Sequence, residues 1–167
     1  MDDAALDDAV RRASVFARVS PYHKLRIVRA LKHDGEVTAM TGMDALTHAV
    51  EAYLCWTYNT KESLHCAEEA VRLIFQNLLH AYRNGDDLAA RANMLEAAYL
   101  AGFAFTRAGV GYVHAIAHSL GGRYGIPHGL ANAIILPHML RVYGDAAAPK
   151  LADLARMAGI APATAQD

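Results

Sequence analysis

The chain has 167 residues, of which 54% are hydrophobic and 20% are charged, and this balance excludes an intrinsically disordered protein. Its formal net charge of -1 gives no electrostatic basis for binding nucleic acid or an anionic membrane surface. No signal peptide and no uncharged apolar run of the ~18 residues needed to span a bilayer are evident. The two cysteines match no disulfide or metal-binding framework. These features predict a cytoplasmic, globular protein.

The first 42 residues have the pattern of a short α/β segment. Residues 15–19 (VFARV) and 36–40 (EVTAM) have the β-branched and apolar composition of strands. Between them, Ser20 and Pro21 are typical of an N-cap and the first position of a helix. A strand, a helix and a second strand in this order predict a βαβ-like unit, which is too small to fold alone.

From residue 43 onwards, the sequence has helical periodicity almost throughout. The predicted helices span residues 43–58, 61–84, 87–108, 111–121, 129–143 and 146–158. Polar residues and glycines at their ends are candidate caps and stops: Thr60, Asp86 or Asp87, Asp145, Gly85, Gly144 and Gly159. The fold class is therefore mainly α, a helical bundle preceded by the α/β segment. The predicted divisions are 1–42, a helical domain over 43–160 and a tail over 161–167.

Two pairs of residues with metal-binding side chains lie in this helical region. Asp44 and His48 form one pair and His114 and His118 the other, each four residues apart, so each pair projects from one helix face. A glycine break at residues 121–122 allows a third imidazole to fold back towards them. One carboxylate and several imidazoles suit a divalent metal such as Fe(II), Zn(II) or Mn(II). The alternative is that these histidines are hydrogen-bonded core residues.

Residues 41–159 resemble the C-terminal, metal-binding domain of the iron-containing alcohol dehydrogenase family. The resemblance is concentrated in GMDALTHAVEAY (residues 42–53) and AGVGYVHAIAHSLGGRYGIPHGLANAIILPH (residues 108–138). It implies a helical bundle of the dehydroquinate synthase-like type.

The resemblance also implies roles for individual side chains. The family binds its metal through one aspartate and three histidines, which match Asp44, His48, His114 and His128. Another family histidine lies close to the nicotinamide and the substrate. It matches His118, which is therefore implied to contact the cofactor and to act catalytically as a proton relay.

The activity implied by this resemblance is metal-dependent hydride transfer between a primary alcohol or aldehyde and NAD(P). The metal would be Fe²⁺, or alternatively Zn²⁺, and it would activate the alcohol. The Gly-rich phosphate loop of the family's dinucleotide-binding domain does not precede Asp44, and the family's helical domain continues past the end of this chain. The cofactor domain is thus expected to be missing. The alternative is an inactive metal-binding module, or a structural remnant whose uncovered apolar faces favour a homo-oligomer.

Residues 8–42 resemble part of the phosphorylation domain of P-type cation ATPases. The likeness lies in VFARVSPYHKLRIVRALKHDGEVTAMTG (residues 15–42), where Lys24 matches the family's phosphoryl-binding lysine. The phosphorylated aspartate and the transmembrane helices have no counterpart, so no phosphoryl transfer is expected. The sequence therefore predicts a junction of two unrelated fragments.

Overall fold

The computed structural model describes residues 35–160. Over this range the chain forms six α-helices and one 3₁₀ turn, with no strand. The elements are α3 (Gly35–Leu54), α4 (Lys61–Arg83), α5 (Leu88–Ala108), α6 (Tyr112–Tyr124), α7 (His128–Tyr143), η1 (Gly144–Ala146) and α8 (Ala148–Met157). The predicted helical bundle is thereby confirmed.

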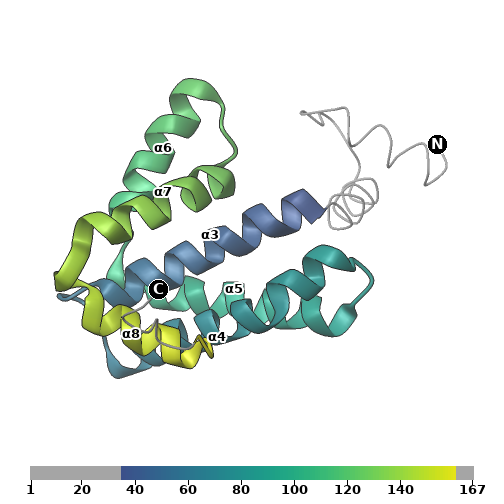
Figure 1. Cartoon of the computed structure of the whole chain (residues 1–167), viewed down its shortest axis with the longest axis horizontal. Coiled ribbons are helices and arrows are strands. Elements are labelled where there is room, and N and C mark those ends of the chain that lie inside the picture. Colours follow the sequence, from purple (N-terminus) through teal and green to yellow (C-terminus); the bar gives the residue numbers. More distant parts are fainter. Residues whose placement is uncertain (1–34, 161–167) are drawn as a thin grey trace, which may run out of the picture.

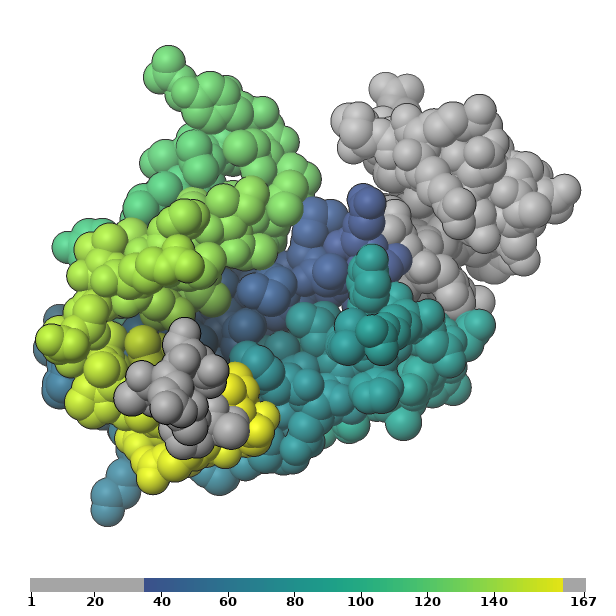
Figure 2. All heavy atoms as spheres, viewed as in Figure 1, coloured from purple at the N-terminus to yellow at the C-terminus, as the bar shows by residue number. Residues whose placement is uncertain are grey.

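Helix α3 is the central element of the bundle (Figure 1). It packs against α4 and α5 on one side and against α7 on the other. Fully buried alanines, such as Ala49, Ala67 and Ala97, allow α3, α4 and α5 to approach one another closely. Helix α6 pairs with α7 and extends away from the body of the molecule (Figures 1 and 2). Helix α6 is attached to α3 through its N-terminal end.

The strand predicted at residues 36–40 is wrong, because these residues form the first turns of α3. The hydroxyl of Thr41 donates to the carbonyl oxygen of Val37 at 2.9 Å, the local bond that threonine makes within a helix. Gly42 is buried and faces side chains of α4 and α5. Tertiary packing thus outweighs the strand preference of this segment. The rest of the predicted βαβ-like unit and the tail lie outside the described residues.

Two of the predicted N-caps are confirmed. The hydroxyl of Thr60 accepts the backbone N–H of Ser63, and the hydroxyl of Ser63 accepts the backbone N–H of Thr60, which forms a capping box at the start of α4. The side chain of Asp87 accepts a backbone N–H from the first turn of α5. Asp145 does not cap the last helix, because it lies inside η1 and α8 begins without a side-chain cap.

The predicted stops are close to the observed helix ends. Gly144 follows α7 with a φ of 51°, and Gly159 lies just beyond α8 with a φ of 74°. This left-handed region is readily adopted by glycine, which has no Cβ. Helix α4 ends at the cap residue Asn84, one residue before the predicted stop at Gly85.

The surface of the described bundle retains large apolar side chains. Leu95, Tyr99 and Phe103 are exposed along α5 at helical spacing. Among residues 35–160, no helix combines the length and apolar character required to cross a lipid bilayer.

Candidate metal centre

Three of the predicted ligands meet where α3, α6 and α7 converge. The Nε2 atom of His128 lies 3.2 Å from Oδ1 of Asp44, and Nε2 of His114 lies 3.5 Å from the same oxygen. One potential ligand atom from each residue lies within 4.8 Å of the other two. Two ligand atoms that each lie about 2.1 Å from an ion in tetrahedral geometry are roughly 3.4 Å apart. The cluster therefore has the dimensions of a site for one divalent ion.

The turn between α6 and α7 brings His128 to this cluster. The predicted break at residues 121–122 is wrong, because α6 continues to Tyr124. The chain instead leaves the helix at Gly125, which adopts a left-handed φ of 68°. Helix α7 then begins at His128, so its first side chain returns to the site that His114 occupies from α6.

His48 lies beside this three-residue cluster. Its Nε2 atom is 3.8 Å from Oδ1 of Asp44, one turn earlier on α3. Its ring stacks on the rings of His114 and Phe105, with centroid separations of 4.0 and 4.2 Å. The structure therefore brings all four predicted ligands together, with His48 the most distant of the three histidines from the shared carboxylate.

His118, the predicted catalytic residue, lies at the outer edge of the site. It is exposed, whereas His114, one turn earlier on α6, is only 1% exposed. Its ring stacks on that of His128 with a centroid separation of 5.0 Å, and it is 6.2 Å from the ring of His114. His118 is thus adjacent to the cluster and open to solvent.

Two residues of the site, Glu51 and Asn132, were not predicted from the sequence. Glu51 is buried on α3, and its Oε2 lies 2.6 Å from Nδ1 of His114. Asn132 is buried on α7, and its amide nitrogen donates to Oδ1 of Asp44 at 2.7 Å and lies 3.1 Å from Nε2 of His128. Glu51 orients His114 through the ring nitrogen that faces away from Asp44, as the partners of metal-bound side chains commonly do, whereas Asn132 contacts the atoms of Asp44 and His128 that face the cluster.

A sequence signal for these two residues did exist. Glu51 stands seven residues after Asp44 and three after His48, so all three share one face of α3. Asn132 stands four residues after His128 on α7, with the same consequence.

The charges of the site are strongly coupled. Burial alone would raise the pKa of Asp44 and of Glu51. The neighbouring His114 and other hydrogen-bond donors outweigh burial, so the pKa of each carboxyl group is lowered. Burial lowers the pKa of His114, but the carboxylates of Asp44 and Glu51 outweigh it and raise the pKa to about 9. Burial and the neighbouring His114 lower the pKa of His48 to about 4. At neutral pH, both carboxylates are therefore ionised and His48 is neutral.

The side chains present fit a divalent metal. No described residue hydrogen-bonds Nε2 of His114 or Nδ1 of His48, although both atoms are buried. Leaving a buried polar atom unpaired costs about 1–3 kcal/mol. Coordination of a metal by Nε2 of His114 would satisfy one of them. A single carboxylate with imidazoles suits Fe(II) or Zn(II).

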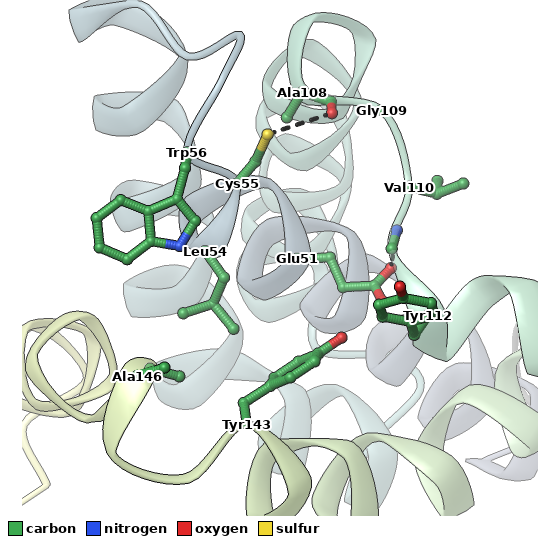
Figure 3. A pocket seen from close by; sticks show the side chains of 12 residues that line it. Glu51, Leu54, Cys55, Trp56, Ala108, Gly109, Val110, Tyr112, Tyr143 and Ala146 are labelled. Carbon is green, nitrogen blue, oxygen red and sulfur yellow. Dashed lines mark hydrogen bonds between the residues drawn. The ribbon is translucent and has the colours of Figure 1, made fainter.

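A separate cavity of about 310 Å³ lies on another side of Glu51 (Figure 3). Its walls include the rings of Trp56, Tyr112 and Tyr143, and the hydroxyl of Tyr143 points towards the Glu51 carboxylate (Figure 3). Glu51 therefore borders both this cavity and the metal centre.

An aspartate and histidines gathered from three helices give this helical domain a candidate metal centre. Residues 38–167 match the Fe-containing alcohol dehydrogenase family, C-terminal, and the chain therefore belongs to that family. The match begins inside the segment that was predicted to be ATPase-like. The comparisons give no support to the resemblance of residues 8–42 to P-type ATPases.

Known relatives share this helical part. The 1,3-propanediol dehydrogenase of Klebsiella pneumoniae is 52% identical over 123 residues, which are 74% of this chain and 32% of that protein. A crystal structure of 1,3-propanediol oxidoreductase matches with a TM-score of 0.74 and 48% identity, over 77% of this chain and 33% of that one. The sulfoacetaldehyde reductase of Bifidobacterium kashiwanohense, solved in complex with NAD+, matches with a TM-score of 0.65 and 28% identity. This match covers 81% of this chain and 40% of the reductase chain. The chain spans about a third of the length of the curated relatives it matches.

Proposed function

We propose that this chain provides the metal-binding part of an iron-dependent alcohol dehydrogenase. The reaction is hydride transfer between a small primary alcohol, or the corresponding aldehyde, and NAD(P). The observation that carries the proposal is the convergence of Asp44, His114 and His128, with the buried Nε2 of His114 left without a hydrogen bond from the described residues. The names of the propanediol relatives and the NAD+ complex of the reductase support the substrate class and the cofactor.

Four side chains would hold the metal: Asp44, His48, His114 and His128. The metal would be Fe²⁺, or alternatively Zn²⁺, and when bound it acts as a Lewis acid that lowers the pKa of the substrate hydroxyl. The ionised carboxylate of Asp44 is half-buried, so its charge is poorly screened by water and attracts a cation strongly. Neutral His48 presents an unprotonated nitrogen, which metal coordination requires.

His118 is proposed to relay the proton and to contact the nicotinamide. Its imidazole is exposed on one side and stacked on the ring of His128 on the other, so it joins the site to solvent. An imidazole exchanges protons readily near neutral pH, which suits removal of the alcohol proton to water.

The second candidate is a metal-binding module that does not turn over substrate. It rests on the same cluster of Asp44, His114 and His128, which could hold an ion without any further chemistry. Self-association also stays a prediction, supported by the exposed apolar side chains of α5.

Metal content measured on protein purified anaerobically and loaded with Fe(II) tests the proposal. We expect about one iron per chain. Asp44→Asn keeps the shape of the side chain but removes its charge, so we expect it to bind iron more than about 100-fold more weakly, a larger loss than an outer-sphere change causes. The matched control, Asp145→Asn, alters an exposed carboxylate in η1 and should bind like the wild type.

A folded wild-type chain that binds no iron would contradict both candidate functions. NAD(P)-linked oxidation of 1,3-propanediol or 1-propanol by the loaded chain then separates the dehydrogenase from the inactive module. Turnover that is present in the wild type and lost in Asp44→Asn supports the first.

A further inference from the structure

The carboxylate of Glu51 makes three hydrogen bonds while almost fully buried. Its residue is 7% exposed, and its oxygens accept the backbone N–H of Gly111 at 2.8 Å and that of Val113 at 2.7 Å. The third contact, of 2.6 Å, is to Nδ1 of His114. All three partners lie on α6 or at its cap, whereas Glu51 belongs to α3.

The contact with His114 determines which ring nitrogen faces the metal centre. An ionised carboxylate only accepts hydrogen bonds, so Nδ1 of His114 must carry a proton. In the neutral imidazole that binds a metal, Nε2 is then the unprotonated nitrogen. This is the atom that lies 3.5 Å from Oδ1 of Asp44.

The other two contacts replace a missing helix cap. Gly111 is the N-cap residue of α6 and has no side chain to accept the free N–H groups of the first turn. Glu51 accepts two N–H groups there, and its negative charge is favourable at a helix N-terminus. A Cβ on Gly111 would lie 2.5 Å from Oε1 of Glu51, so the absence of a side chain is what lets the carboxylate approach.

We propose that Glu51 is a positioning residue that couples metal binding to the docking of α6. One carboxylate both presents Nε2 of His114 to the metal and holds the first turn of α6 against α3. The rest of α6 extends away from the body of the molecule (Figure 1). The contacts of Glu51 therefore link metal binding to the packing of the α6 N-terminus on α3. Metal binding and attachment of the α6 N-terminus therefore strengthen each other. The inference rests on the metal site of the proposed function and assigns Glu51 no contact with the metal.

The first test is the Zn(II) affinity of Glu51→Gln, measured by competition with a chromophoric chelator. Glutamine has nearly the same shape but replaces one accepting oxygen by an NH₂ donor, which cannot face the N–H groups of Gly111 and Val113. We expect Zn(II) to bind about 10–100-fold more weakly, the usual cost of removing an outer-sphere partner. The matched control, Glu96→Gln, changes an exposed carboxylate on α5 and should bind Zn(II) within about twofold of the wild type.

A second readout separates positioning from general destabilisation. ¹⁵N NMR of labelled histidine reports the tautomer of each ring. We expect His114 to carry its proton on Nδ1 in the zinc-loaded wild type and to lose this preference in Glu51→Gln. Zinc should also slow hydrogen exchange of the Gly111 and Val113 amides in the wild type, and less so in the variant.

Gly111→Ala provides a test that keeps the carboxylate. The new methyl group should push Glu51 away and weaken Zn(II) binding, whereas Gly122→Ala, in open space on the same helix, should not. Zinc affinity that is unchanged in both Glu51→Gln and Gly111→Ala would overturn this inference alone, as would an unchanged His114 tautomer. A wild-type chain that binds no Zn(II) would overturn the proposed function together with it.

Discussion

Replacing His114 with alanine is expected to abolish metal binding, whereas replacing His118 with alanine should change metal affinity by no more than about threefold. The two residues lie one turn apart on α6, yet their surroundings differ. His114 is 1% exposed, and its Nε2, which makes no hydrogen bond with the described residues, lies 3.5 Å from the Asp44 carboxylate. His118 is exposed and lies outside the three-residue cluster. Calorimetric titration with Zn(II), which avoids oxidation of iron, measures both affinities.

Loss of folding must be separated from loss of a ligand in this pair. Removing the buried His114 ring leaves a cavity and takes away one of the three hydrogen-bond donors of the Glu51 carboxylate, so His114→Ala should also lower the free energy of unfolding. His114→Gln fills most of that space and is expected to restore the thermal midpoint more than the zinc affinity. Equal loss of zinc in His114→Ala and His118→Ala, with both proteins folded, would show that His118 is a ligand.

The helices were predictable because their signals are local. Apolar periodicity placed α4, α5, α7 and α8 to within two residues at each end, although it ended α6 too early, and Thr60 and Asp87 cap the helices they were expected to cap. The failure at residues 36–40 has a non-local cause. Valine and threonine favour strands in isolation, but Gly42 lets this segment pack closely against α4 and α5, and the helix extends back to Gly35.

The site was predictable only as far as its spacing and its family resemblance allowed. Asp44 and His114 are singled out by their partners four residues away, and the structure places both in one cluster. The bond from His114 to Glu51 joins residues 63 positions apart, and no periodicity indicates such a pair. Glu51 could have been suspected from its place on the face of Asp44, but its partner could not.

A second large effect is expected from Gly129→Ala at the start of α7. A Cβ at this position would collide with the backbone carbonyl of Met40 on α3. A carbonyl held within a helix cannot rotate away, so α7 must move as a unit. We expect the free energy of unfolding to fall by about 2–3 kcal/mol, the usual cost of overpacking, and the thermal midpoint to fall by roughly 5–10 °C.

Gly122→Ala is the matched control for this substitution. It makes the same change inside α6 at a position where a Cβ meets nothing within 4 Å. Because alanine favours a helix over glycine by about 1 kcal/mol, this variant should be slightly stabilised. Thermal midpoints that move in the same direction in both variants would contradict the close approach of α7 to α3.

The same substitution should also weaken metal binding. His128 precedes Gly129 directly and lies 3.2 Å from the Asp44 carboxylate across the gap that the new methyl group would widen. A ligand held on a displaced helix binds the ion less well, so the zinc-induced rise in thermal midpoint should be smaller in Gly129→Ala than in Gly122→Ala. An equal rise in both would mean that the metal centre tolerates movement of α7, and that the position of His128 is set by its own turn and not by the packing of α7 on α3.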